Sequence, residues 1–366
     1  MRDRFSAMLS FTMLLALAPY GVQCYAGAAA SSAPLTLAGR SQLPGYTGDF
    51  DHFAVDVKGN RLFLAGEDGG TLEVFNLKTG QLERTVKGFE QPHSILYLPE
   101  RNRLIVTDSG DSMTKVVDAT TYRIVGKIQL APGADSMFYD PSRKHMYVVT
   151  GGKNARKKMA DTIVSEVDPM TGKRIGDIKF DTDFTESMAA EQKGNRLFIN
   201  VTGKSQIAVV NKNTRAVTAM WPIKDGELNA PMKLDEDHHR LFVVTRKPFK
   251  LLVINSDTGE EITSFKAPER TNEMLFDAAN HRIYLAGDDY LYVIQQKDAD
   301  HYEELAHVPS AKGAKTAVLV PSLKRVYTAV SPGDDKVGGE LLWFNVNGGS
   351  TQDSVARKTT FETNAE

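Results

Sequence analysis

A short pattern, a basic residue followed by apolar residues, recurs seven times along the chain. The first apolar residues of the copies are, in order, Leu62, Leu104, Met146, Leu197, Leu241, Ile283 and Val326. Successive copies are 42, 42, 51, 44, 42 and 43 residues apart. Such a near-constant period is typical of repeat architectures, in which each copy forms one structural unit. No other feature of the 366 residues constrains the fold as strongly.

Each copy contains four short runs rich in β-branched and aromatic residues and separated by turn residues. In the first copy these runs are residues 53–57, 61–65, 71–76 and 82–87. A Thr-Gly pair separates the third and fourth runs of several copies, and glycine there suits a hairpin turn that needs positive φ. These pairs are Thr79-Gly80, Thr171-Gly172 and Thr258-Gly259. The pattern predicts an all-β fold, a seven-bladed β-propeller of four-stranded antiparallel blades.

The last copy has only three runs and ends at residues 341–346. The missing run is predicted at the N-terminal side, because residues 37–44 are similar to 124–131, the outer run of the second copy. We expect residues 35–44 to pair with 341–346 and to close the ring, which removes exposed sheet edges. The propeller then spans residues 35–347, and the polar segment 348–366 is predicted to be a flexible tail.

Residues 1–26 have the pattern of an export signal. Arg2 and Arg4 precede an apolar stretch over residues 5–22, and small residues at Cys24 and Ala26 suit cleavage. We therefore expect a periplasmic or secreted protein without a transmembrane segment once the signal is removed. Lipidation of Cys24 is the alternative to cleavage after Ala26. Cys24 is the single cysteine, so its removal leaves a mature chain with neither a disulfide nor a cysteine nucleophile.

The charge balance excludes two classes of function. The chain carries 44 Lys and Arg against 46 Asp and Glu, for a net charge of −2. This balance argues against a strongly basic nucleic-acid binder and against a polybasic membrane anchor. We expect a monomer whose partner is a small molecule or a protein at the top face of the propeller, and no nucleic acid.

Two segments carry a resemblance to a known family. Residues 146–151, Met-Tyr-Val-Val-Thr-Gly, and residues 197–211 resemble the YVTN repeat of seven-bladed, YncE-like periplasmic propellers in the WD40/YVTN repeat-like superfamily. The resemblance covers residues 35–347. It implies the propeller fold but not one activity, because such propellers include binding proteins, scaffolds, dehydrogenase subunits and some lyases or lactonases. The two tryptophans, Trp221 and Trp343, are too few for the tryptophan-docked blades of a quinoprotein.

The candidate site follows from the expected geometry of the ring. The innermost strand of each blade lines the central tunnel, so the residues at the start of those strands should converge at one mouth. Alignment of the seven copies places these pairs there: Asp51-His52, His93-Ser94, Asp135-Ser136, Glu186-Ser187, Ala230-Pro231, Asn272-Glu273 and Lys315-Thr316. Crowded carboxylates and imidazoles shift one another's pKa values, which is typical of functional sites.

The residue types suggest roles if the mouth is catalytic. His52 and His93 are the candidate bases, Glu186 or Glu273 the orienting group or acid, and Lys315 or Arg246 the group that stabilises an anion. As a binding site, the mouth would use the following ligand-binding residues: Asp51, Asp135, Asn272, Lys315 and Arg246.

No cofactor is predicted. A divalent metal is the alternative that the donor types allow, although no local spacing supports it. The donors considered are Asp51, His52, His93, Glu186 and Glu273.

Three hypotheses remain open. The first is an exported propeller that binds a small ligand or protein partner at the mouth. The second is a periplasmic enzyme of the lactonase or lyase type that uses the same His and carboxylate groups. The third, a structural subunit of a redox complex, ranks last because no cofactor motif supports it. The sequence does not decide whether the chain is an enzyme.

Overall fold

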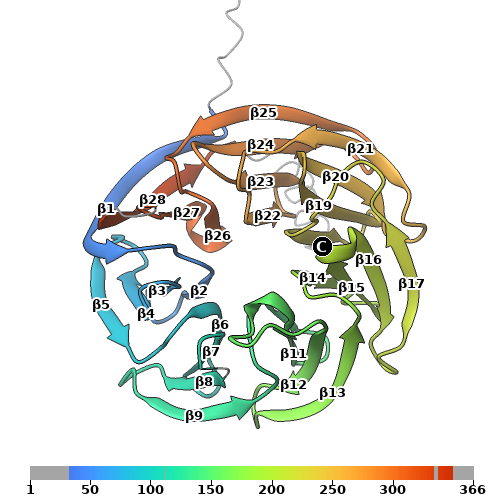
Figure 1. The fold of residues 1–366 in the computed structure, drawn as a ribbon. Coiled ribbons are helices and arrows are strands. Elements are labelled where there is room, and N and C mark those ends of the chain that lie inside the picture. The colour runs from blue at the N-terminus through green and yellow to red at the C-terminus, as the bar shows by residue number, and fades with distance from the viewer. Residues whose placement is uncertain (1–32, 112, 334–336, 349–366) are drawn as a thin grey trace, which may run out of the picture. The chain divides into compact units, whose positions relative to one another are not determined.

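The strands of the protein form seven four-stranded sheets arranged as a ring (Figure 1). This computed structural model describes residues 33–111, 113–333 and 337–348. The predicted signal peptide and all but the first residue of the predicted tail lie outside the described residues. The described helical elements are three short 3-10 turns: η1 (Gly152–Asn154), η2 (Thr202–Lys204) and η3 (Pro321–Leu323). The predicted seven-bladed, four-stranded propeller is confirmed.

The first four blades follow one another in chain order. Blade 1 consists of β2 (Phe53–Asp56), β3 (Arg61–Gly66), β4 (Thr71–Asn76) and β5 (Leu82–Lys87). Blade 2 consists of β6 (Pro92–Leu98), β7 (Arg103–Asp108), β8 (Met113–Asp118) and β9 (Ile124–Gln129). Blade 3 consists of β10 (Met137–Asp140), β11 (His145–Gly151), β12 (Thr162–Asp168) and β13 (Lys173–Phe180). Blade 4 consists of β14 (Met188–Ala190), β15 (Arg196–Val201), β16 (Gln206–Asn211) and β17 (Val217–Pro222).

The remaining blades complete the ring, and the last contains both ends of the described chain. Blade 5 consists of β18 (Met232–Asp235), β19 (Arg240–Arg246), β20 (Phe249–Asn255) and β21 (Glu261–Lys266). Blade 6 consists of β22 (Glu273–Asp277), β23 (Arg282–Ala286), β24 (Tyr290–Gln296) and β25 (Tyr302–Pro309). Blade 7 consists of β26 (Thr316–Val320), β27 (Arg325–Val330), β28 (Val337–Val346) and β1 (Leu35–Thr47).

β1 closes the ring by pairing antiparallel with β28. The register runs from Leu35 opposite Val346 to Thr47 opposite Val337, so the closing ladder is longer than predicted. In Figure 1 the blue β1 lies beside the red β28 at the outer edge of blade 7. Among the described strands, all other paired neighbours are consecutive in the chain, so the β1–β28 pairing is the one that joins its two ends.

Trp343 and Trp221 each pack against a glycine of the next blade. A Cβ atom added to Gly80, in the β4–β5 turn of blade 1, would lie 2.3 Å from the ring of Trp343 in blade 7. A Cβ atom at Gly259, in blade 5, would lie 2.4 Å from the ring of Trp221 in blade 4. Both glycines also have positive φ, 72° and 76°, as the bulged turn requires. Glycine at these turns is thus needed for conformation and for packing.

The second and third strands of the blades are buried between neighbouring blades. β3 is buried from Leu62 to Gly66, whereas outer strand β5 is mostly exposed. A sheet covered on both faces favours continuous apolar runs over strict alternation. In six of the seven repeats the second apolar position holds an aromatic residue that is at most 1% exposed and packs between blades. These residues are Phe63, Tyr147, Phe198, Phe242, Tyr284 and Tyr327.

The basic residue of the repeat links one blade to the next. Arg196 Nη1 donates to the carbonyl of Ser256 at 2.6 Å, and Arg240 Nε donates to that of Ala299 at 3.0 Å. Three further arginines contact carbonyl oxygens of the following blade in the same way: Arg61, Arg282 and Arg325. In blades 2 and 3 the basic residue instead pairs within its own blade, Arg103 with Asp118 and His145 with Glu166.

Burial along β1 predicts how strongly the closure depends on individual side chains. Leu43 is 3% exposed in the core between blades 7 and 1, whereas Leu37 on the same strand is 48% exposed. Truncation of a buried leucine to alanine costs about 2–5 kcal/mol. We expect Leu43→Ala to lower the free energy of unfolding by that amount and Leu37→Ala by less than about 1 kcal/mol. Denaturant unfolding of both variants checks this, and equal effects would contradict the closing role of the buried face of β1.

Candidate functional site

The first strands of the blades start at the same end of the ring and bring polar side chains to one opening. The mouth pocket, of about 140 Å³, is the hollow lined by these side chains together with residues of the β3–β4 and β11–β12 loops. Its walls include Asp51, His52, Glu67, His93, Asp135, Ser136, Lys153, Asn154, Glu186, Asn272 and Lys315. A second hollow of about 180 Å³, the tunnel pocket, shares His52, Ser136, Glu186 and Asn272 with it and continues along the inner strands.

All nine residues selected from the sequence line one of these two pockets. Seven of them line the mouth pocket, and Arg246 and Glu273 line the tunnel pocket. They come from all seven blades, because six blades have a polar residue at the start of the first strand and blade 5 has one at the end of its second strand. Blade 5 presents Ala230-Pro231 at the first position and contributes Arg246 at the second.

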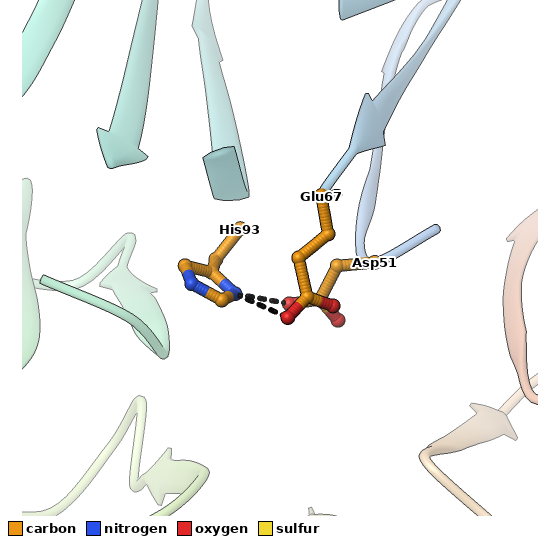
Figure 2. Close-up of side chains that lie close together, drawn as sticks. All are labelled: Asp51, Glu67 and His93. Atoms are coloured by element: carbon orange, nitrogen blue, oxygen red, sulfur yellow. Dashed lines mark hydrogen bonds and ion pairs between the residues drawn. The ribbon is translucent and has the colours of Figure 1, made fainter. Parts of the chain in front are cut away.

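His93 is held at both ring nitrogens. Its Nδ1 lies 2.9 Å from Asp51 Oδ2, 3.4 Å from Asp135 Oδ1 and 3.9 Å from Glu67 Oε1. Its Nε2 lies 2.9 Å from Ser109 Oγ, on the opposite side of the ring. Figure 2 shows the imidazole facing the carboxylates of Asp51 and Glu67. One imidazole nitrogen, Nδ1, therefore lies within 4.0 Å of three carboxylates.

Asp51 joins the two histidines. Its second oxygen lies 3.5 Å from His52 Nε2 and accepts a hydrogen bond from Asn272 Nδ2 at 3.3 Å. His52 Nδ1 in turn lies 3.0 Å from Glu273 Oε2. Burial alone would raise the pKa of the Asp51 carboxyl, but the charges of His52 and His93 hold it well below its usual range.

The same contacts change the protonation of the imidazoles. Burial disfavours the charged form of His52, yet Asp51 and Glu273 outweigh it and raise the pKa of His52 to about 10. For His93, burial is outweighed by Asp135 and Asp51, and the pKa again rises to about 10. Both rings thus carry a proton at neutral pH. An imidazolium has no free lone pair, so in this state the two histidines donate hydrogen bonds and do not act as bases.

Two carboxyls of the mouth pocket titrate close to neutral pH. Burial, together with the charge of Asp51, raises the pKa of Glu67 to about 7. Burial and the charges of Glu186 and Asp51 outweigh His93 and raise the pKa of Asp135 to about 6. Glu67 was absent from the sequence-based set, although it lies two residues after the second run of the first copy, residues 61–65. A search of the residues after each second run, as well as before each first run, would have included it.

Arg246 forms the boundary between the two pockets. Its Nη2 donates to Asn272 Oδ1 at 2.8 Å, and its Nη1 lies 3.4 Å from Glu186 Oε1. Glu186 also accepts a hydrogen bond from Ser136 Oγ at 3.2 Å. Lys315 lies at the rim, where its Nζ donates to Asp49 Oδ2 at 2.6 Å. Both cations are therefore near the opening, but neither forms an ion pair with Asp51.

The loop between β11 and β12 carries four basic residues, Lys153, Arg156, Lys157 and Lys158. Lys153 Nζ lies 3.0 Å from the centre of the Phe184 ring and lines the mouth pocket. Burial, and then the charge of Arg246, lowers the pKa of Lys153. Arg156 pairs with Glu90 on the outer surface, and Lys157 and Lys158 are exposed. Only the first residue of this loop's basic group therefore belongs to the mouth pocket.

One group of side chains in the described part of the chain has the spacing of metal ligands. Asp51, Glu67 and His93 each present a donor atom within 4.8 Å of the other two. Of the five residues considered from the sequence, Asp51 and His93 belong to this group. His52, Glu186 and Glu273 do not, and Glu67 takes the third position.

Comparison with known proteins shows the fold alone. Neither a protein-family model nor a curated protein matches this sequence. Hydrazine synthase of Kuenenia stuttgartiensis superimposes with a TM-score of 0.65 at 14% identity, over 78% of this chain and 92% of that chain. A chain of the mitotic checkpoint complex gives a TM-score of 0.68 at 11% identity, over 94% and 99% of the two chains. In the described residues, no helix has the length and apolarity to cross a lipid bilayer.

The raised pKa of Glu67 predicts a pH-dependent stability. The unfolded carboxyl has a pKa of about 4.3, so the stabilisation is present below that pH and is lost as pH rises through about 7. We expect the stability of the wild type relative to Glu67→Gln to fall by about 2 kcal/mol between pH 5 and pH 8. Urea unfolding of both proteins at the two pH values measures this. Glu260→Gln, an exposed site, is the control, and a constant difference between wild type and Glu67→Gln would contradict the assignment.

Proposed function

We propose that this chain is an exported propeller of the YVTN, YncE-like kind that binds a small polar ligand or a segment of a protein partner at the mouth pocket. One observation carries the binding part of the proposal. Charged side chains from distant parts of the sequence converge there, and those of Asp51 and His93 are 9% and 7% exposed. Burying a charged side chain costs free energy, and the fold does not need charged side chains at this position. Their presence therefore favours a role in binding.

The protonation of the histidines supports binding over base catalysis. With pKa values of about 10, His52 and His93 present positive charge at neutral pH, next to carboxylates of blades 1, 3 and 6. The opening therefore offers hydrogen-bond donors and acceptors side by side, which suits a ligand with several polar groups. The rim also carries Lys153 and Lys315, so charges of both signs lie within reach of one small molecule.

A second candidate, a periplasmic enzyme of the lactonase or lyase type, is favoured by a different observation. Glu67 and Asp135 have pKa values of about 7 and 6 and line the mouth pocket. Carboxyls that titrate near neutral pH are suited to transfer protons. In this alternative Glu67 and Asp135 would be the acid and base, and the histidines would stabilise developing negative charge.

Ligand binding is tested by thermal unfolding in the presence of defined compounds. The probes are succinate, glutamate and putrescine, which represent anionic, zwitterionic and cationic small molecules. We expect at least one of them, at a concentration about 100 times its Kd, to raise the melting temperature of the wild type by several degrees. His52→Ala and Arg246→Ala should weaken the apparent affinity for that probe at least tenfold, and the shift in melting temperature should be smaller as a result.

The matched control is His301→Ala, because the side chain of His301 is 78% exposed and lies in blade 6 away from the tunnel. Circular dichroism confirms that each variant is folded before binding is compared. Absence of a shift with all three probes would overturn small-ligand binding at the mouth. An equal shift in the wild type and in both mouth variants would place the binding elsewhere and would also overturn it.

The export part of the proposal rests on the sequence pattern of residues 1–26. We expect the full-length chain, expressed in a Gram-negative bacterium, to appear in the periplasm or medium with Gly27 as its first residue. N-terminal sequencing and intact mass measure this directly. Substitution of Arg2 and Arg4 by Glu should reduce the exported fraction severalfold. A mature protein that retains Met1 in the cytoplasm would contradict the proposal, and a mass increase at Cys24 would indicate lipidation.

A further inference from the structure

The carboxylates around His93 lack the basic partners that usually neutralise buried acids. Asp51, Glu67 and Asp135 all lie within 4.0 Å of an imidazole nitrogen of His93 or His52. Among the described residues, no Lys or Arg forms an ion pair with any of the three. Three buried or half-buried carboxylates therefore share two imidazoles. With both rings protonated and all three carboxyls ionised, the group holds one more negative charge than positive charge.

A chain of hydrogen bonds fixes the direction in which His93 points. Gln91 Nε2 lies 3.4 Å from Glu67 Oε1, and Gln91 Oε1 accepts from Ser109 Oγ at 3.0 Å. The Ser109 hydroxyl has one proton, so it accepts from His93 Nε2, 2.9 Å away. This arrangement makes Nε2 the donor and turns Nδ1 toward Asp51 and Glu67. A ligating histidine typically has its second nitrogen held in this way.

The donor atoms have the spacing of a metal coordination shell. In a tetrahedral zinc site, bonds of about 2.0–2.2 Å place neighbouring donors about 3.4 Å apart. His93 Nδ1 lies 2.9 Å from Asp51 Oδ2 and 3.9 Å from Glu67 Oε1, on either side of that value. All three donors lie within 4.8 Å of one another and line the mouth pocket. The three donors are therefore close enough together for one ion to lie between them.

We propose that Asp51, Glu67 and His93 form a binding site for one divalent transition-metal ion, with a coordination position left open toward the mouth pocket. The ion supplies the positive charge that the carboxylates lack and replaces the proton between His93 Nδ1 and Asp51. The inference deepens the proposed function, since an ion with an open position can bind a donor atom of the ligand directly. Asp135, 3.4 Å from His93 Nδ1, adds negative charge beside the ion without being one of its three ligands.

The donor set favours a transition metal over calcium or magnesium. Calcium takes six to eight oxygen ligands, and magnesium requires a near-octahedral oxygen shell, neither of which includes an imidazole. One imidazole and two carboxylates suit zinc and its neighbours in the first transition series. Zinc is therefore the probe for the test, and calcium is the comparison ion.

The experiment is isothermal titration of zinc chloride into the mature chain after treatment with EDTA, with no organic ligand present. We expect one zinc ion per chain with a Kd in the micromolar range or tighter, and no comparable binding of calcium. His93→Ala and Glu67→Gln should weaken zinc binding at least 100-fold. Ser109→Ala, which removes the acceptor of Nε2 and its link to Gln91 but none of the three proposed ligands, should weaken it about tenfold. The graded loss distinguishes a ligand from a positioning residue.

His238→Ala is the matched control, because His238 and Asp235 form another imidazole–carboxylate pair, 2.7 Å apart, at the far end of blade 5. It should bind zinc as the wild type does. Glu67→Gln keeps the size of the side chain, so it remains informative if His93→Ala unfolds. No zinc binding, or equal binding by wild type, His93→Ala and Glu67→Gln, would overturn the inference.

The outcomes separate this inference from the proposed function. A chain that binds zinc but responds to none of the three organic probes contradicts the proposed function alone. A chain that responds to a probe after EDTA treatment, but does not bind zinc, contradicts the metal site alone.

Discussion

Antiparallel pairing of β1 with β28 is the contact on which the mouth pocket depends. It joins the two ends of the described chain in one blade, and thereby brings blade 7 beside blade 1. Lys315 of blade 7 reaches Asp49 just before blade 1, and Asp51 and His52 follow within three residues. Without closure, nothing would hold the segments that carry Lys315 and Asp51 close together. The charged cluster is thus a product of ring geometry more than of local structure.

The fold could be predicted because the repeat reports three-dimensional contacts directly. The aromatic position, as in Phe198 and Tyr284, fills the space between blades, and the arginine position donates to a carbonyl of the next blade. Both contacts recur with the period of the sequence. The exceptions at Arg103 and His145 could not be foreseen, because the choice between a carbonyl in the next blade and a carboxylate in the same blade depends on distances that the pattern does not contain.

The sequence was enough to predict which residues line the candidate site, but not their protonation states. Alignment of the repeats placed His52, His93 and Asp135 together, since the strand start is a fixed position in every blade. It could not give their charge states, because those depend on which oxygen faces which nitrogen. The sequence suggested the histidines as bases, whereas the contacts with Asp51 and Glu273 keep them protonated at neutral pH. Glu67 was missed because only one of the two classes of loop at the mouth was searched in full.

The placement of the two tryptophans gives the molecule a pair of built-in optical reporters. Trp343 contacts the turn at Gly80 across the junction of blades 7 and 1, and Trp221 contacts the turn at Gly259 across the junction of blades 4 and 5. Their indole emission responds to solvent at two separate seams of the same ring. A change in the emission of Trp343 alone therefore signals the opening of the seam between blades 7 and 1, and a change in that of Trp221 alone signals the opening of the seam between blades 4 and 5.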